Sequence, residues 1–252
     1  LLVDTLFDLP LTAEMLASMR DAAPGAVSID TLVNTHANGD HTYGNQLVGG
    51  AAIIASKDCA EEMEIRPPEA FISRVKSWQD MGNAGAIIWE LMGRKFDFEG
   101  IKNTLPTQTF DRELTLNVGN KRIELTNLGP AHTLGDVIVH VPEDRIVYTG
   151  DIVFVGGHPV MWAGPVSNWI GACDHILNLD VDIVVPGHGP ISTKNEVRAL
   201  RSYLIELHDE ARKRYEAGLD WVAASEEIVA DFFSEAAVRW IHQSASYRKI
   251  SW

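Results

Sequence analysis

The residues from His36 to His41 read H-A-N-G-D-H and place several groups that can bind a metal in one short loop. His36 and His41 offer imidazole nitrogens, and Asp40 offers a carboxylate. Asn38 adds an amide between them. Three more groups of these kinds occur farther along the chain, at His132, Asp151 and His188. Neutral imidazole and carboxylate ligands together suit zinc, iron or manganese, so the sequence predicts a transition-metal site.

The three later groups stand where the chain is expected to turn sharply. His132 lies in A-H-T-L-G-D, Asp151 ends the run Y-T-G-D, and His188 lies in P-G-H-G-P. Glycine permits backbone conformations that other residues avoid, and side chains at strand ends can converge beside a sheet. One histidine at a strand end is more often structural. Four histidines and two aspartates in matching positions favour a metal centre.

Short apolar runs supply the strands that would position these groups. The runs cover residues 1–4, 26–35, 51–55, 137–141, 145–148 and 182–185. A hairpin is expected where residues 114–118 and 122–128 flank a Gly-Asn pair. A helix is expected over residues 13–21, with Thr12 as its N-cap. Strands that alternate with helices indicate an α/β layered domain.

Two helical regions complete the predicted arrangement. Residues 57–103 are expected to form a helical insertion near the site, whose aromatic side chains serve either as core or as a lid. Residues 193–243 are expected to form C-terminal helices, because apolar residues from Val197 onward follow a helical spacing. No internal repeat or low-complexity linker separates these parts, so residues 1–252 are predicted to form one domain.

In order and spacing, these motifs resemble those of the metallo-β-lactamase superfamily, from Val3 to about Ser192. That family's signature is H-x-H-x-D-H, then a histidine, an aspartate after a strand, and a histidine in a P-G-H-G turn. The resemblance implies an αββα sandwich, an α/β fold in which two mixed β-sheets lie face to face with helices outside. Such domains normally begin with further strands, so we expect one or more strands upstream of Leu1.

The resemblance also implies two sets of ligands for divalent transition metals. The first set is His36, residue 38 and His132. The second set is Asp40, His41 and His188. Asp151 would bridge the two sets. One or two metals are thus the expected cofactor, with zinc as the first choice and iron or manganese as alternatives.

The activity that the resemblance implies is hydrolysis by a metal-bound hydroxide. Bound metal lowers the pKa of water to near neutrality and polarises the carbonyl of the substrate. Asp40 would orient the hydroxide and carry its proton to the leaving group. Asn38 stands beside Asp40 among the candidate catalytic residues.

Asn38 departs from the family pattern, which has a histidine at this position. An amide oxygen is a poorer ligand for zinc than an imidazole nitrogen. Three interpretations stay open. In the first, Asn38 binds the first metal weakly through its oxygen. In the second, Asn38 is not a ligand and the first site is weak or empty, which leaves an enzyme with one metal at the second site. In the third, the domain is a non-catalytic binding or scaffold protein with a residual metal site. The six other ligands are intact, which favours an enzyme.

Asp151 narrows the substrate class that the resemblance implies. True β-lactamases of this superfamily usually carry Cys or Ser at this position, whereas glyoxalase II-like thioesterases and lactonases carry a bridging aspartate. We therefore expect a hydrolase of an ester, thioester or lactone with an apolar acyl or aromatic part. A lyase or cyclase that uses the same metal centre, or a β-lactam hydrolase, is the alternative.

The loop after Asp151 is expected to border the site. Phe154, Met161 and Trp162 could form an apolar wall for the substrate, or they could pack against the helical insertion. His158 in the same loop is a candidate acid or base or an extra metal ligand, although a surface histidine is the simpler interpretation.

Composition limits the partners that we expect. The chain of 252 residues carries a formal charge of −14, which argues against nucleic acid and against an anionic membrane surface. No apolar stretch is long enough to span a membrane. We therefore expect a small-molecule substrate and a cytoplasmic location, with any signal peptide upstream of Leu1. The tail from Trp240 to Trp252 carries apolar residues through which a homodimer could form.

Overall fold

The computed structural model of the chain describes residues 1–25 and 28–232. The end of the predicted C-terminal helical region and the tail from Trp240 to Trp252 therefore lie outside the described residues. No helix within residues 1–25 and 28–232 combines the length and the apolar character that crossing a membrane requires.

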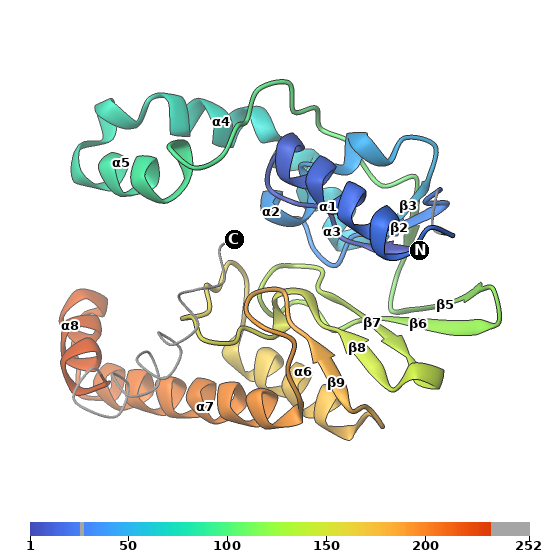
Figure 1. The fold of residues 1–252 in the computed structure, drawn as a ribbon. Coiled ribbons are helices and arrows are strands. Elements are labelled where there is room, and N and C mark those ends of the chain that lie inside the picture. The colour runs from blue at the N-terminus through green and yellow to red at the C-terminus, as the bar shows by residue number, and fades with distance from the viewer. Residues whose placement is uncertain (26–27, 233–252) are drawn as a thin grey trace.

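Two β-sheets face each other, and helices cover their outer sides (Figure 1). The sheet of order β1-β2-β3-β4 consists of β1 (Leu2–Val3), β2 (Thr31–Val33), β3 (Ala52–Ser56) and β4 (Gln108–Phe110). The sheet of order β5-β6-β7-β8-β9 consists of β5 (Glu113–Val118), β6 (Lys121–Asn127), β7 (Val137–Val141), β8 (Ile146–Tyr148) and β9 (Ile183–Val185). This arrangement confirms the predicted α/β sandwich of two sheets with helices outside.

The prediction that both sheets are mixed is correct for one sheet and wrong for the other. Within the described residues, the four-stranded sheet is parallel throughout. A helical segment joins each of its strands to the next, and such a connection returns the chain to the same end of the sheet. The five-stranded sheet is mixed, because β5 to β8 pair antiparallel and β9 then pairs parallel to β8 after a helical crossover.

The helices form the two outer layers. The α-helices are α1 (Leu9–Ala22), α2 (Gly39–Thr42), α3 (Lys57–Ile65), α4 (Pro68–Lys76), α5 (Gly82–Ile88), α6 (Val166–Asn178), α7 (Lys194–Glu216) and α8 (Trp221–Phe232). Shorter helical turns are η1 (Asn45–Val48), η2 (Trp78–Met81), η3 (Trp89–Gly93), η4 (Pro142–Asp144) and η5 (Gly150–Ile152). In Figure 1, α6 and α7 lie along the outer face of the five-stranded sheet, and α1 and α3 lie with the four-stranded sheet.

Helix α1 begins earlier than the sequence predicts. The side chain of Asp8 accepts a hydrogen bond from the backbone N–H of Leu11 at 2.8 Å and so acts as the N-cap. Pro10 fits the first turn, where its missing N–H costs nothing. Thr12, the predicted cap, is instead buried inside the helix, with its hydroxyl bonded to the carbonyl oxygen of Asp8.

The core has two layers, and strand β7 contributes to both. Val137 and Val139 face the space between the sheets, where they pack with residues such as Leu125. Ile138 points the other way, toward α6 and α7, and packs with Trp169. Successive side chains of a strand point to opposite faces, and all five residues of β7, including His140, are buried, so this strand is covered on both sides. This central strand holds the two layers of the core in register.

The segment that the sequence assigns to a helical insertion, residues 57–103, contains α3 to α5 and the turns η2 and η3. Helix α3 packs on β3 and β4, whereas α4 and α5 extend beside the sandwich (Figure 1). Three rings of the insertion, Phe71, Phe96 and Phe98, surround Phe7, with ring centroids 4.9 to 5.6 Å from it. These aromatic residues therefore serve as a core that fixes the insertion to the loop after β1.

Candidate metal centre

Six imidazole and carboxylate side chains converge where ends of strands from both sheets meet. The four-stranded side supplies His36 after β2, and Asp40 and His41 in α2. The five-stranded side supplies His132 between β6 and β7, Asp151 after β8, and His188 after β9. Their ligand atoms form two groups, and the atoms within each group lie within 4.8 Å of one another.

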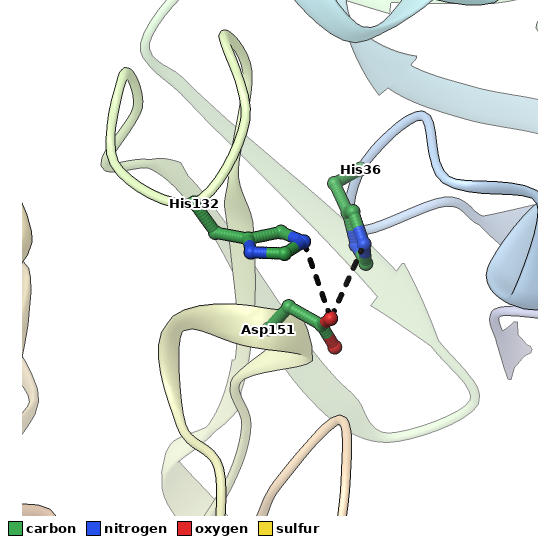
Figure 2. Close-up of side chains that lie close together, drawn as sticks. All are labelled: His36, His132 and Asp151. Carbon is green, nitrogen blue, oxygen red and sulfur yellow. Dashed lines mark ion pairs between the residues drawn. The ribbon is translucent and has the colours of Figure 1, made fainter. Parts of the chain in front are cut away.

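The first group consists of His36, His132 and Asp151, all buried (Figure 2). Atom Nε2 of His132 lies 3.2 Å from Oδ2 of Asp151, and Nε2 of His36 lies 3.7 Å from the same oxygen. Figure 2 shows that the two rings and the carboxylate point toward one common space.

The second group consists of Asp40, His41 and His188. Atom Oδ2 of Asp40 lies 3.2 Å from Nε2 of His188 and 3.7 Å from Nε2 of His41. This group is more open than the first, since the side chain of Asp40 is 32% exposed.

Asp151 connects the two groups. Besides its contacts in the first group, its carboxylate lies 3.2 Å from Nε2 of His41 and 3.3 Å from Nε2 of His188. A single carboxylate that is 2% exposed thus reaches all four imidazoles. This is the position expected of a ligand that bridges two metals.

The donor atoms fit a divalent transition metal. Three buried atoms, His36 Nε2, His41 Nε2 and Asp151 Oδ1, make no hydrogen bond in the structure. A buried polar atom without a hydrogen bond lowers the stability of the fold by about 1–3 kcal/mol. Three such atoms at one place therefore suggest that the site binds a group which satisfies them. Imidazole nitrogens and carboxylate oxygens are ligands for zinc, iron and manganese, and a bound cation would satisfy all three atoms.

Asp4, at the end of β1, fixes the orientation of two of the histidines. Its Oδ2 accepts hydrogen bonds from Nδ1 of His41 at 3.0 Å and from the hydroxyl of Thr35 at 2.7 Å. That hydroxyl in turn lies 3.0 Å from Nδ1 of His36. Because Nδ1 of each ring is engaged by these contacts, Nε2 is the nitrogen that faces the centre and that a metal would bind.

The loop after Asp151 fixes the orientation of the His132 ring. The carbonyl oxygen of Val160 accepts a hydrogen bond from Nδ1 of His132 at 2.5 Å. The backbone N–H groups of Trp162 and Ala163 donate to the carbonyl oxygen of His132. Sequence reasoning missed Asp4, Thr35 and Val160, because strand pairing and loop conformation bring them to the histidines.

Burial and mutual charge set the pKa values of the site. Burial lowers the pKa of His36 well below its usual value, and the neighbouring His41 lowers it further. Burial also opposes the charging of His188, but hydrogen bonds with Asp151 and Asp40 outweigh it and raise the pKa of His188 to about 9. Burial disfavours the Asp40 carboxylate, yet His41 and His188 lower its pKa to about 2. Burial disfavours the Asp151 carboxylate too, yet His41 and His36 hold its pKa well below its usual value, so both aspartates are ionised near neutral pH.

Asn38 lies at the first group. Its side-chain nitrogen Nδ2 lies 3.1 Å from Nε2 of His132 and donates to it. The side chain makes no cap bond to α2, so the amide is directed to the site rather than to its own helix. Which end of an amide points inward is an assignment, and rotation by a half turn would aim the oxygen at the same place. Weak metal binding through Asn38 and a supporting contact to His132 therefore both stay predictions.

A glycine allows the turn with His188 to approach Asp151. A Cβ atom on Gly187 would lie 2.0 Å from Oδ1 of Asp151 and 2.7 Å from the backbone of Gly150. The backbone N–H of Gly187 donates to the carbonyl oxygen of Gly150 at 2.8 Å. The P-G-H-G turn that the sequence singles out thus has a direct steric reason for its first glycine.

The predicted substrate wall lies on the His132 side of the site. Phe154 is buried and stacks on His188, with ring centroids 5.0 Å apart. Met161 and Trp162 are exposed. Atom Nδ1 of His158 lies 2.6 Å from the hydroxyl of Tyr203 on α7, and His158 belongs to neither metal-ligand group. Contact of these four loop residues with substrate stays a prediction.

A cavity of about 920 Å³ opens on the other side, against Asp40, His41 and His188. Most of the side chains that line it are apolar. They come from the loop after β1, from α1, from the end of the insertion and from the ends of β8 and β9, and include Leu6, Phe7, Leu11, Met15, Met92 and Phe96. The cavity-lining residues do not include Phe154, His158, Met161 or Trp162. Sequence reasoning missed this cavity, because its walls are distant in the chain.

The sequence model of the metallo-beta-lactamase superfamily matches residues 1–188 of the chain. This range contains all six imidazole and carboxylate ligands and the residues that line the cavity.

Two curated relatives match shorter parts of the chain. The acyl-coenzyme A thioesterase MBLAC2 of Bos taurus is 27% identical over 101 residues, which are 38% of this chain and 34% of the thioesterase. The 2,4-dinitroanisole O-demethylase subunit alpha of Nocardioides sp. (strain JS1661) is 32% identical over 88 residues, which are 32% of this chain and 26% of that subunit. The chain thus covers about a third or less of the length of these relatives.

Among solved structures, a metallo-beta-lactamase from Pontibacter korlensis superposes with a TM-score of 0.57. The superposition covers 80% of this chain and 81% of that chain, at 20% sequence identity. A likeness at this identity establishes the fold and leaves the substrate to be argued from the site.

Proposed function

Because the chain belongs to the metallo-beta-lactamase superfamily, we propose that it hydrolyses an ester, a thioester or a lactone with an apolar acyl or aromatic part. The observation that carries the proposal is the largely apolar cavity of about 920 Å³ that reaches Asp40, His41 and His188. An apolar group in this cavity would bring the adjoining ester or thioester bond to the ligands. A thioester is the first choice, since one relative is named an acyl-coenzyme A thioesterase.

The two aspartates suit different tasks. A divalent metal bound by the six ligands would lower the pKa of water and polarise the substrate carbonyl. Asp40 borders the cavity, and its partly exposed carboxylate can orient water and pass a proton to the leaving group. Asp151 is 2% exposed and surrounded by imidazoles, so it holds the geometry of the site and stays out of proton exchange with the substrate.

A purely structural or scaffold role fits the site less well. Such a role would not need three buried ligand atoms left without hydrogen bonds, nor an apolar cavity that leads to them. All six imidazole and carboxylate ligands are present in two compact groups. The chain is accordingly a metallo-hydrolase by family and by site, and the proposal concerns its substrate.

The test is a substrate panel assayed with the zinc-, iron- and manganese-loaded protein. The panel contains decanoyl-coenzyme A, an aryl decanoate ester, a medium-chain lactone, a chromogenic β-lactam and 2,4-dinitroanisole. We expect turnover of the acyl thioester or ester to exceed that of the β-lactam and the aryl ether. Full metal loading without turnover of any ester, thioester or lactone would refute the proposal.

Two variants serve as controls for this assay. Asp40→Ala should abolish turnover, because it removes both a ligand and the proton carrier at the cavity. Asp21→Asn changes an exposed aspartate on α1 whose side chain makes no hydrogen bond or ion pair among the described residues, and it should leave turnover unchanged. Equal activity in the two variants would show that the observed hydrolysis does not depend on Asp40, contrary to the role assigned to this residue.

A further inference from the structure

One lysine lines the cavity beside the metal ligands. Among the described residues that line it, the charged groups apart from histidines are Asp4 and Asp40 at the metal end and Lys95. Lys95 follows the turn η3, and its backbone N–H donates to the carbonyl oxygen of Met92. The neighbouring Phe96 packs edge-on against Phe7 at 4.9 Å. The backbone that carries Lys95 is thus fixed to the cavity wall.

Lys95 has no ion-pair partner among the described residues, although acidic residues are close in the chain. Glu90 instead pairs with Arg94 at 3.0 Å. Asp97 uses its carboxylate to accept the backbone N–H of Glu99 at 3.0 Å. The side chain of Lys95 is exposed at the cavity, and no hydrogen bond or ion pair of its ammonium group occurs among the described residues, so this group is available to a ligand.

We infer that Lys95 binds an anionic group of the substrate, at a position apart from the bond that is cleaved. The apolar stem of a lysine can lie along an apolar wall while its ammonium group meets a carboxylate or phosphate. The substrate class is therefore an amphipathic ester or thioester with an apolar part for the cavity and an anion for Lys95. This inference rests on the proposed function, because it assigns the substrate of the same site.

The anion has two chemical sources. It is either a carboxylate at the far end of the acyl group or a phosphate on the leaving group. Both sources present oxygen acceptors to the ammonium group, and either would set specificity without touching the metal ligands.

Binding to the metal-loaded protein tests the inference without any turnover. Calorimetry would compare two ligand pairs that differ by one anionic group: dodecanedioate with dodecanoate, and 4′-phosphopantetheine with pantetheine. Each pair shares the group that can contact the metals, so the ratio of dissociation constants within a pair isolates the second anion. We expect the anion to tighten binding by about threefold to fivefold in one pair, as for a partly exposed ion pair.

Lys95→Ala should abolish that advantage, and Lys95→Arg should keep most of it. Arg94→Ala is the matched control, since Arg94 is an exposed cation next in the chain that pairs with Glu90 and does not line the cavity. It should leave both ratios unchanged. The pair whose ratio responds to Lys95→Ala identifies the source of the anion.

Two results would overturn the inference. One is that neither ratio changes in Lys95→Ala. The other is that Arg94→Ala lowers a ratio as much as Lys95→Ala. That result would show that the positive charge of the whole region, and not a contact with Lys95, strengthens binding of the anion. If the substrate panel fails while Lys95→Ala still abolishes the binding advantage, the proposed function is wrong and the anion site stands.

Discussion

At the scale of single residues, Asp4 determines how two histidines present their nitrogens. Its Oδ2 binds Nδ1 of His41 directly and reaches His36 through the hydroxyl of Thr35. Asp4 also holds a left-handed backbone conformation, with φ of 57°, which is uncommon outside glycine. A strained residue that orients metal ligands is a sign that the site constrains the backbone.

We expect Asp4→Asn to weaken metal binding by about tenfold to a hundredfold, because an amide no longer supplies the charge that fixes the His41 ring. Zinc titration by calorimetry measures the change. Asp21→Asn is the control for a lost surface charge and should not alter zinc affinity. The role assigned to Asp4 fails if its variant binds zinc as tightly as the native protein.

Asn38→His tests whether the amide weakens the first metal group. Asn38 lies 3.1 Å from Nε2 of His132, so an imidazole at this position can reach the metal that His36 and His132 would hold. We expect zinc affinity at the weaker of two sites to rise by about tenfold or more, since imidazole is the better ligand. If the native protein already binds two zinc ions with equal, tight affinity, Asn38 does not limit the first site.

Zinc binding should release protons near neutral pH. The pKa of His188 is raised to about 9 by Asp151 and Asp40 despite burial, so without metal its ring carries a proton at pH 7. A metal needs the unprotonated nitrogen, so the apparent zinc affinity should fall as the pH drops below about 9. Calorimetry in two buffers of different ionisation enthalpy counts the protons. A count of zero would contradict this assignment.

The ligands themselves could be predicted from the sequence, and the groups behind them could not. His36, Asp40 and His41 stand in one motif, and His132, Asp151 and His188 stand in recognisable glycine-rich turns. Asp4 meets His41 only because β1 pairs with β2 in a particular register. No local pattern in residues 1–4 predicts that pairing.

At the scale of elements, the turn after β9 depends on close contact with the turn after β8. Gly187 touches Gly150 and Asp151 so closely that a methyl group would overlap Oδ1 of Asp151. We expect Gly187→Ala to displace the carboxylate and to lower zinc content to less than half of the native value. Metal analysis after dialysis provides the measurement.

Gly171→Ala is a matched control for that substitution. Gly171 lies in α6, where an added Cβ meets nothing within 4 Å. Alanine is the better helix former, so this variant should keep its zinc and gain up to about 1 kcal/mol of stability. A Gly187→Ala protein with full zinc content would show that the turn can adjust, contrary to the steric argument.

Elements with a local signature were predictable, and those that depend on distant contacts were not. The hairpin of β5 and β6 follows from alternating residues around Gly119, whose φ is 62°. The start of α1 differs from the prediction, because both Asp8 and Thr12 are possible caps and the folded chain buries Thr12 while the side chain of Asp8 accepts the N–H of Leu11. The cavity was missed since α1, the insertion and the end of β9 meet only in the folded chain.

At the scale of the whole molecule, the ligands connect the two halves of the sandwich. His36, Asp40 and His41 belong to the four-stranded side, whereas the other three ligands belong to the five-stranded side. Each metal group contains residues from both sides. Bound metal would therefore act as a cross-link between the sheets, and metal binding and folding should be coupled.

This coupling predicts that zinc raises the melting temperature. At free zinc of about 100 times the dissociation constant, binding to the folded chain alone adds about 2.7 kcal/mol. For a domain of this size each kcal/mol raises Tm by about 2–4 °C, so a rise of about 5–10 °C is expected in scanning calorimetry. Asp151→Asn should show a much smaller rise, because it removes the charge that joins both groups. An unchanged Tm in native protein with zinc demonstrably bound would mean that zinc binds the unfolded chain as tightly as the folded one, which would contradict the proposed coupling of metal binding to folding.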